Sequence, residues 1–192
     1  MRSSTSLPSQ ETVKNELERV QYRSRYKKVI FSTAATLITV AAVAVLVATL
    51  WMPVLQIYGS SMTPALGDGD VLVSVKGTQF ETGDIIAFYY NNKILVKRVI
   101  AKAGDIVDIQ DDGNVLVNGV PLEEPYLTEK ALGNCDIELP YQVPAAKLFV
   151  MGDHRSTSAD SRNTAIGCVA EEQIVGKIVF CVWPISVFGF VS

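Results

Sequence analysis

One uncharged apolar run, residues 29–50, constrains the fold of this chain more than any other feature. Its 22 residues would form a helix of roughly 33 Å at about 1.5 Å per residue, enough to cross a hydrocarbon core of about 30 Å. Trp51 suits the membrane interface that follows, and Pro53 is a natural stop for the helix. The run therefore predicts a transmembrane helix over residues 29–51.

Basic residues crowd the N-terminal side of this run, in a polar segment over residues 1–28. They are Lys14, Arg19, Arg23, Arg25, Lys27 and Lys28. The positive-inside tendency would place this segment in the cytoplasm and residues 53–192 outside, as an extracytoplasmic domain. A cleaved secretory signal also has a basic start, but its apolar region is usually about 7 to 15 residues long. The longer run, with no clear small-x-small pattern at its end, favours an uncleaved anchor.

The composition excludes some classes of protein. Of 192 residues, 48% are hydrophobic, which is ample for a core, and the net charge of −3 lacks the basic excess that nucleic-acid binding usually needs. The three cysteines, Cys135, Cys168 and Cys181, show no CxxC spacing and are odd in number. Neither a zinc site nor a full disulfide framework is expected, although one bridge stays open.

Beyond the apolar run, short β-branched segments alternate with Gly, Asp and Asn. The segments that read as strands are residues 71–75, 85–90, 94–101, 106–110, 115–117, 148–151 and 174–182. Residues 91–92 and 111–114 have the composition of hairpin turns, and residues 121–144 read as a long excursion outside the core. We expect a mainly β chain, in which the transmembrane helix precedes an antiparallel, barrel-like sheet that is closed or folded over.

A serine just past the anchor and a lysine within a predicted strand are the first candidates for chemistry. The hydroxyl of Ser61 would be a nucleophile only if a neighbouring base removed its proton. Lys97 interrupts the apolar residues 94–100, and burial there could lower its pKa from about 10.4 by the two to three units that a base needs near neutral pH. Strand alternation would point Lys97 and Arg98 to opposite faces. Each residue also has a plainer reading, Ser61 in an ordinary turn and Lys97 as an edge-strand charge.

Four segments together resemble the conserved boxes of bacterial type I signal peptidases. They are residues 59–66, 69–73, 97–105 and the polar stretch 152–162, in the same order and directly after an N-terminal anchor. The resemblance implies a membrane-bound serine endopeptidase that removes N-terminal signal peptides from exported pre-proteins. It implies no metal or organic cofactor, and no catalytic histidine or aspartate.

The resemblance also assigns roles to individual residues. Ser61 would be the nucleophile, Lys97 the general base, and Ser158 the serine that hydrogen-bonds and orients the lysine. Asp160 and Arg162 match a pair that holds the loop around Ser158. The chain's one histidine, His154, stands where many members carry Asn, and it is interpreted as a loop residue.

The resemblance is less complete for the oxyanion site and for the turn beside it. The backbone N–H of Ser61 is the first expected oxyanion donor. Some family members place a serine two residues before the nucleophile, where this chain has Gly59; the second donor therefore stays open between Gly59 and Ser60. Gly152 and Asp153 would shape the turn, with Gly152 allowing a close approach.

For the substrate, the resemblance implies an extended peptide with small residues at positions −3 and −1 before the cut. Met62 would help to form a shallow pocket, and Ile86 and Ala87 could line the same groove. The expected partners are secretory pre-proteins and the lipid bilayer of the bacterial cell membrane. The aromatic segment 182–190 either packs on the domain or touches that bilayer.

Two other functions stay open from the sequence. One is a related Ser/Lys peptidase with a narrower substrate, although the anchor argues against a DNA-bound repressor. The other is an inactive, membrane-anchored β domain that binds peptides without cutting them.

Overall fold

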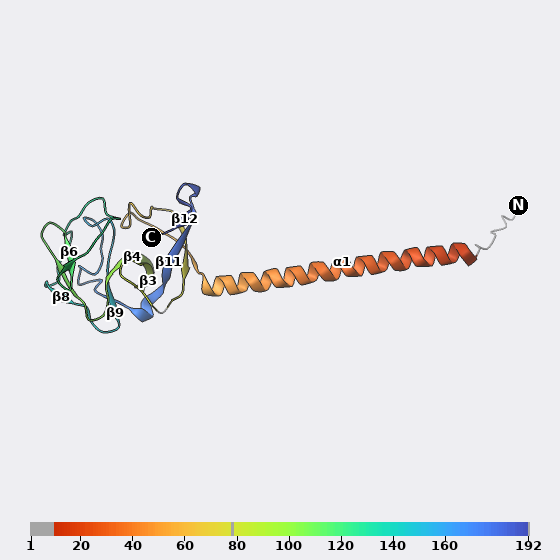
Figure 1. Cartoon of the computed structure of the whole chain (residues 1–192), viewed down its shortest axis with the longest axis horizontal. Coiled ribbons are helices and arrows are strands. Elements are labelled where there is room, and N and C mark those ends of the chain that lie inside the picture. The colour runs from red at the N-terminus through yellow and green to blue at the C-terminus, as the bar shows by residue number, and fades with distance from the viewer. Residues whose placement is uncertain (1–9, 78, 192) are drawn as a thin grey trace. The chain divides into compact units, whose positions relative to one another are not determined.

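The computed structural model describes residues 10–77 and 79–191, and the chain divides into a helical unit up to Ala48 and a β-rich unit from Thr49 (Figure 1). The first nine residues of the predicted basic segment lie outside the described part. The expected fold class, an N-terminal apolar helix followed by an antiparallel β domain, is confirmed.

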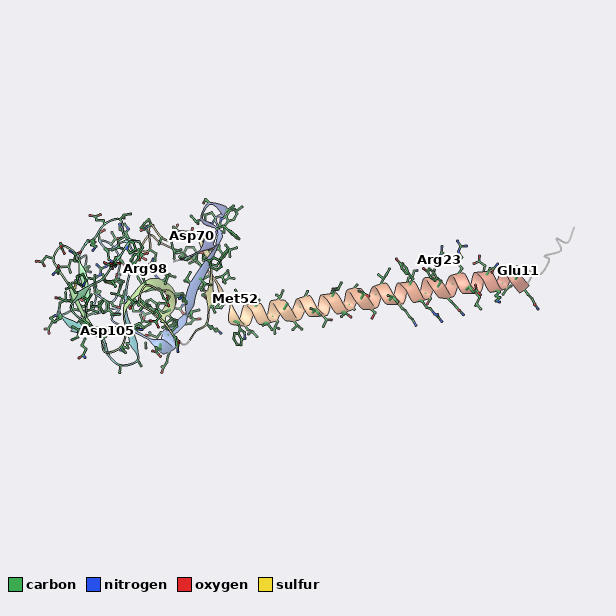
Figure 2. The ribbon with its side chains drawn as sticks, in the orientation of Figure 1. Glu11, Arg23, Met52, Asp70, Arg98 and Asp105 are labelled. Carbon is green, nitrogen blue, oxygen red and sulfur yellow. The ribbon has the colours of Figure 1, made fainter. Side chains whose placement is uncertain are left out.

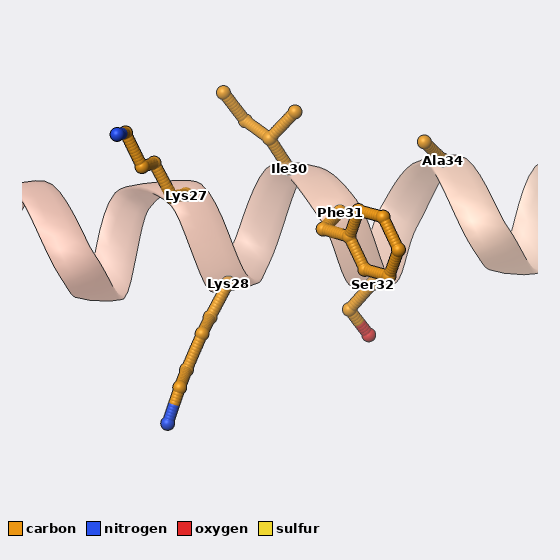
Figure 3. Close-up of a pocket in the computed structure, with 6 residues that line it drawn as sticks. All are labelled: Lys27, Lys28, Ile30, Phe31, Ser32 and Ala34. Atoms are coloured by element: carbon orange, nitrogen blue, oxygen red, sulfur yellow. The ribbon is translucent and has the colours of Figure 1, made fainter.

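Helix α1, Gln10–Trp51, is longer than the predicted membrane span because the basic segment before the span is helical as well. Glu, Leu, Lys and Arg are good helix formers, and Glu16 pairs with Arg19 one turn later. The charges stop at Lys27 and Lys28, which point to opposite sides of the helix just before Ile30 and Phe31 (Figure 3).

Two hydroxyls in the apolar part of α1 find their acceptors within the helix. The hydroxyls of Thr36 and Thr39 each donate to the carbonyl oxygen four residues earlier, at 2.9 Å. A helix in hydrocarbon needs such internal partners because no water is available there. In the described part of the chain, α1 is the one helix long and apolar enough to cross a membrane.

The β-rich unit contains two antiparallel sheets. The larger has the strand order β1-β2-β11-β3-β4-β9-β10, with β12 added to β11, and the smaller has the order β7-β6-β5-β8. The strands are β1 Val54–Gln56, β2 Val71–Val75, β3 Ile85–Tyr90, β4 Lys93–Ala101, β5 Ile106–Ile109, β6 Val115–Val117, β7 Val120–Pro121, β8 Tyr141–Gln142, β9 Lys147–Met151, β10 Val169–Ala170, β11 Ile174–Trp183 and β12 Gly189–Phe190. Two single 3-10 turns, η1 Glu171–Gln173 and η2 Ile185–Val187, flank β11.

All seven predicted strands occur, within one residue of their expected ends, and both predicted hairpins form. Asn91 takes a positive φ of 52° between β3 and β4, and Gly113 takes 84° between β5 and β6. A Cβ on Gly113 would lie 2.3 Å from the backbone nitrogen of Ala131, so this position has room only for glycine. The strands that the sequence did not predict are two or three residues long, too short for a periodic signal.

Residues 121–144 contribute more to the core than the sequence suggested. Leu122, Leu132, Ile137 and Leu139 from this excursion pack against the cluster formed by β4, β5, β6 and β9. Their apolar side chains are scattered among Pro, Gly and Asn, so no strand or helix period marks them as buried.

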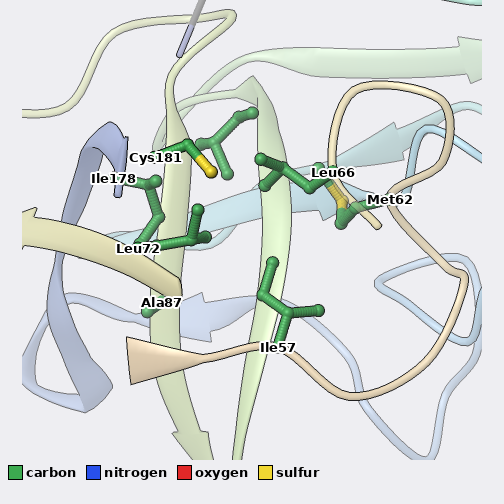
Figure 4. Packing of buried hydrophobic residues seen from close by; sticks show 8 residues of the cluster. Ile57, Met62, Leu66, Leu72, Ala87, Ile178 and Cys181 are labelled. Carbon is green, nitrogen blue, oxygen red and sulfur yellow. The ribbon is translucent and has the colours of Figure 1, made fainter. Parts of the chain in front are cut away.

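A second apolar cluster fixes the segment that follows Ser61. Met62 and Leu66 are 1% and 2% exposed and pack with Ile57, Leu72 and Ala87, beside Ile178 and Cys181 of β11 (Figure 4). The N–H of Leu66 donates to the carbonyl oxygen of Met62 at 2.9 Å, closing a single helical turn. Burying a methionine side chain contributes roughly 1.5–3 kcal/mol, so this turn is anchored directly beside Ser61.

The aromatic C-terminal segment packs on β11 and is also exposed. The ring of Phe180 lies 4.9 Å from that of Phe188 and 5.2 Å from that of Phe190, both edge to face. Phe190 nevertheless remains 88% exposed and Ile185 76% exposed. Packing against the domain is therefore real, and it leaves an apolar surface on this segment.

Candidate active site

The side chains of Ser61 and Lys97 are in contact, although they come from different parts of the larger sheet. Ser61 lies in the turn between β1 and β2, and Lys97 lies in the middle of β4. The Nζ of Lys97 is 2.7 Å from the Oγ of Ser61, and it donates a second hydrogen bond of 3.1 Å to the carbonyl oxygen of Val96. The two side chains that the sequence singled out are thus in direct contact, although 36 residues separate them.

Burial lowers the pKa of Lys97. The side chain is only 3% exposed, and the loss of water outweighs the opposing attraction of Asp160 and Asp153. Arg162 adds a smaller repulsion in the same direction as burial. No salt bridge to Lys97 occurs among the described residues, so its amine faces neutral partners.

Arg98, the next residue on β4, has a different environment. Its guanidinium forms a bidentate pair with Asp153, with bonds of 2.9 and 2.8 Å, and donates to the carbonyl oxygen of Gly83 at 2.8 Å. The ring of Tyr126 covers it, with a centroid 3.9 Å from Cζ. Figure 2 shows Arg98 inside the β-rich unit, where it is 1% exposed. Asp153, expected only to shape a turn, thus also neutralises a buried cation.

A second buried pair braces the loop of residues 152–162. Asp160 accepts two hydrogen bonds of 2.8 Å from Arg162 and one of 2.9 Å from the N–H of Gly152. Arg162 also donates to the carbonyl oxygen of Leu132 at 2.6 Å. The pair therefore ties the start of the loop to its end and to the excursion of residues 121–144.

A third pair was not predicted from the sequence. Arg155 is bonded to both carboxylate oxygens of Glu124 and donates to the carbonyl oxygen of Gly152 at 3.2 Å. The hydroxyl of Tyr126 donates to the same carboxylate at 3.1 Å, and burial raises the pKa of Tyr126. No pattern around Glu124 distinguishes it from an exposed loop acid, so its pairing with Arg155 depends on the fold alone.

Gly152 lies at the closest approach between the loop and Ser61. A Cβ there would be 2.2 Å from the Oγ of Ser158 and 2.5 Å from the carbonyl oxygen of Ser61. Glycine is therefore needed at this position for a steric reason, because any side chain would collide with Ser158 and Ser61.

Ser158 differs from its expected role. It is 3% exposed, and its Oγ has no hydrogen-bond partner in the described part of the chain. The Nζ of Lys97 donates to Ser61 and to Val96, and the predicted hydrogen bond between Lys97 and Ser158 does not occur among the described residues.

The structure distinguishes between the candidate hydrogen-bond donors for the oxyanion. The N–H of Ser61 makes no hydrogen bond to a described residue, so it is free to bind substrate. The N–H of Gly59 donates to Asp68 at 2.6 Å, which removes it as a second donor. Ser60, the other candidate, is exposed beside the nucleophile.

A groove of about 770 Å³ runs past Ser61 and Lys97. It is lined by residues 54–58 around β1, by Ser61 and Met62, and by residues 92–97 of the turn before β4 and its first half. The edge of β4 is free here because β9 pairs with β4 only from Arg98 onward. Likewise β1 pairs only with β2, so two strand edges border the groove.

Of the three predicted lining residues, only Met62 borders the groove. Ile86 and Ala87 are fully buried in two apolar clusters, and the prediction that they line the groove does not hold. Both lie on β3, which is covered by β4 on one side and β11 on the other. Ile86 is directly opposite Lys97 in the β3–β4 register, so it shields the lysine from water.

Fold and site together define the class of protein: a β-rich serine peptidase domain that follows an N-terminal apolar helix. The family model described as signal peptidase, peptidase S26, matches residues 30–183. Signal peptidase IB of Staphylococcus aureus (strain MRSA252) is 38% identical over 154 residues, which cover 70% of this chain and 79% of the relative. Signal peptidase I of Bacillus amyloliquefaciens is 38% identical over 139 residues, with coverages of 66% and 71%. A crystal structure of a signal peptidase I from Enterococcus faecalis V583 aligns with a TM-score of 0.43 and 29% identity, over 52% of this chain and 97% of that one.

The chain therefore belongs to the signal peptidase family, peptidase S26. The resemblance that four short segments suggested is confirmed by a match that covers most of the chain.

Proposed function

We propose that this protein removes N-terminal signal peptides from exported pre-proteins, with Ser61 as nucleophile and Lys97 as general base. The observation that carries the proposal is the 2.7 Å contact between Ser61 Oγ and the buried Nζ of Lys97. A lysine without an ion pair in an apolar site is neutral at a lower pH than a free lysine, and only the neutral amine can accept a proton.

In the acylation step, Ser61 Oγ attacks the carbonyl carbon of the peptide bond while its proton moves to Lys97 Nζ. The resulting oxyanion accepts a hydrogen bond from the free N–H of Ser61, and the hydroxyl of Ser60 is the second donor. The Lys97 ammonium then returns the proton to the leaving amine, which departs as the new N-terminus of the mature protein.

In the deacylation step, Lys97 takes a proton from water, and the hydroxide attacks the ester formed with Ser61. Collapse of the second tetrahedral intermediate releases the signal peptide as a carboxylic acid, which loses its proton to solvent, and the proton on Lys97 returns to Ser61 Oγ. The enzyme thus ends in its starting protonation state without any other acid or base.

Ser158 accepts a hydrogen bond from Lys97 when the lysine is charged. A neutral amine has two N–H donors and a lone pair, whereas the ammonium has three donors and needs a third acceptor. Contacts to Ser61 and Val96 use two of these donors. The buried, unpartnered Ser158 Oγ is the remaining acceptor, and leaving such a hydroxyl unpaired costs about 1–3 kcal/mol.

An extended pre-protein segment binds between the free edges of β1 and β4. Main-chain hydrogen bonds to these edges give affinity, and alternate side chains point into the groove. Residues −1 and −3 therefore face the same wall, where Met62 and Ile57 are already buried in the core. The limited depth beside Met62 favours small side chains at both positions.

The apolar part of α1 and the basic residues before it support a location of this chemistry at the outer surface of the bacterial cell membrane. Basic residues precede the apolar part of α1, which favours a cytoplasmic N-terminus and an extracytoplasmic domain over residues 53–192. The lipid bilayer is then a partner of residues 29–51, and pre-proteins reach the groove as they leave the membrane.

Ser61→Ala tests the proposal in the full chain, solubilised in detergent micelles with a model pre-protein as substrate. The matched control is Ser156→Ala, an exposed serine of the 152–162 loop. We expect Ser61→Ala to remove cleavage while the unfolding temperature stays unchanged, and Ser156→Ala to cleave normally. Persistent cleavage by Ser61→Ala would remove Ser61 from the mechanism. Wild-type protein that binds the pre-protein without cutting it would instead indicate a peptide-binding domain.

A further inference from the structure

A hydrogen-bond chain behind Ser61 runs through two side chains that the mechanism above does not use. The hydroxyl of Thr63 donates to the carbonyl oxygen of Ser60 at 2.8 Å, and the Thr63 N–H donates to the same oxygen at 3.1 Å. The Nδ1 of His154 lies 3.4 Å from the Thr63 hydroxyl oxygen. The backbone N–H of His154 donates to the carbonyl oxygen of Ser61 at 3.1 Å.

The direction of each bond follows from the available hydrogens. Because the Thr63 hydroxyl hydrogen is committed to Ser60, the hydroxyl can only accept from His154. Nδ1 of His154 must therefore carry a hydrogen when the two pair. At 3.4 Å this bond is long, so it contributes less than the 2.8 Å bond that Thr63 makes to Ser60.

The acceptor of this chain has a particular place in the active site. The carbonyl of Ser60 and the N–H of Ser61 are the two ends of one planar, conjugated peptide group. Hydrogen bonds that draw electron density to the carbonyl oxygen make the N–H at the other end a stronger donor, by about 10–30% per bond. They also fix the plane of the peptide, and hence the direction of the N–H.

We propose that Thr63 is a positioning residue for the oxyanion site: it holds and polarises the peptide whose N–H stabilises the tetrahedral intermediate, and His154 supports it. This inference rests on the proposed function, because it assigns a role to the environment of Ser61. His154 grips the peptide on the other side of Ser61 as well, through its backbone bond to the Ser61 carbonyl. Thr63 thus holds the peptide group before Ser61, and the His154 backbone holds the peptide group after it.

Thr63→Val tests the role, since valine keeps the shape of threonine and removes the hydroxyl. Removing a direct oxyanion donor lowers kcat by about 10²–10³-fold, and we expect a smaller loss, about three- to thirtyfold, for a residue that acts one bond away. KM for a peptide that spans a signal-peptide cleavage site should stay within about twofold. Thr63→Ser, which keeps the hydroxyl, should restore kcat. The matched control is Thr157→Val, because Thr157 is exposed in the loop of His154.

A peptide aldehyde gives a readout that a merely structural role would not move. The aldehyde forms a tetrahedral adduct with a serine hydroxyl and so places an oxygen in the oxyanion site. Its inhibition constant should rise in Thr63→Val by the same factor as kcat/KM falls, while the affinity of an uncleaved product peptide stays constant.

His154 is tested through its coupling to Thr63. We expect His154→Ala to lower kcat about two- to fivefold, less than Thr63→Val, because its bond is longer and one step further away. The double variant Thr63→Val/His154→Ala should be no slower than Thr63→Val alone, since both act on one chain. Losses that multiply in the double variant would show that His154 does not act through Thr63.

The outcomes separate this inference from the proposed function. Thr63→Val that cleaves as fast as Thr157→Val overturns the positioning role, provided that Ser61→Ala is inactive. A lower unfolding temperature in Thr63→Val, together with no recovery in Thr63→Ser, would reduce Thr63 to a structural residue. Active Ser61→Ala would instead remove the nucleophile, and the positioning role with it.

Discussion

The two faces of strand β4 surround their buried basic side chains with different partners. Lys97 and Arg98 are adjacent residues, 3% and 1% exposed. Arg98 is neutralised by Asp153 and covered by Tyr126, whereas the hydrogen bonds that Lys97 makes to described side chains and carbonyls go to the Ser61 hydroxyl and the Val96 carbonyl. On the Arg98 face the charge is kept and compensated; on the Lys97 face burial works against the charge.

The difference follows from the ease with which each side chain loses its proton. An arginine cannot lose its proton in a protein, so a buried arginine must be paired if the fold is to be stable. A lysine can become neutral when its site is dry and no carboxylate is bound to it. The Asp153 pair thus stabilises the loop of residues 152–162, and the absence of such a pair at Lys97 makes the amine available as a base.

The largest expected effect that tests this comparison is on the Lys97 face. Lys97→Met should lower kcat/KM for a model pre-protein by about 10³–10⁴-fold, because general-base catalysis is lost. The free energy of unfolding should stay constant or rise, since an apolar side chain replaces an amine that burial disfavours. Lys147→Met, an exposed lysine at the start of β9, is the matched control. A Lys97→Met protein that unfolds more easily than wild type would mean that the charge of Lys97 is structural.

On the other face we expect the reverse pattern. Arg98→Met leaves the buried Asp153 carboxylate without its partner and should lower the free energy of unfolding by about 3–5 kcal/mol. Chemical denaturation in detergent micelles measures this change. The double variant Arg98→Met/Asp153→Leu should recover much of the stability because no charge is left unpaired. A loss below about 1 kcal/mol in the single variant would contradict the structural role assigned to the pair.

The next effect is on pH dependence. Because burial lowers the pKa of Lys97, cleavage should fall about tenfold per pH unit below that pKa and level off above it. Between this lowered pKa and the ordinary lysine pKa of about 10.4, the unfolded chain binds a proton that the folded chain does not. Stability should therefore rise with pH in that window, by at most about 1.4 kcal/mol per unit, and Lys97→Met should remove this rise. A rate that keeps rising up to the ordinary lysine pKa of about 10.4 would show that burial does not act on Lys97.

The smallest effect is expected for the exposed cation just beyond β4. Lys102 forms a 2.7 Å salt bridge with Glu81, and this hydrogen bond raises the pKa of Lys102. Water and salt screen a pair of this kind, so Lys102→Ala should leave cleavage and the unfolding temperature unchanged. A clear drop in either measurement would mean that pairing alone, rather than burial, explains the contrast between Lys97 and Arg98.

The sequence predicted the main elements of the fold and the two atoms at the centre of the proposed chemistry. A long apolar run identified the second half of α1, and short β-branched runs identified the long strands, because both patterns can be recognised without knowledge of any contact. Ser61 and Lys97 were identified by chemical type and by a family resemblance. By contrast, the strand β1, which borders the groove, has three residues and gives no period at all. Ile86 and Ala87 were placed at the groove because their strand was expected to neighbour it, but a local pattern does not show which strands cover a given strand.

The sequence by itself thus determined the N-terminal apolar helix, the β character of the rest and the residues proposed as reactive groups, because these depend on residue type and local spacing. Only the tertiary structure decided that Arg155 pairs with Glu124, that Asp68 occupies the N–H of Gly59, and that the Oγ of Ser158 has no hydrogen-bond partner among the described residues. Each of these contacts depends on how loops distant in the sequence pack, and on strand registers that shift within β4 and β11. Hydrogen bonds between such segments require positions accurate to a fraction of an ångström, which no local pattern specifies.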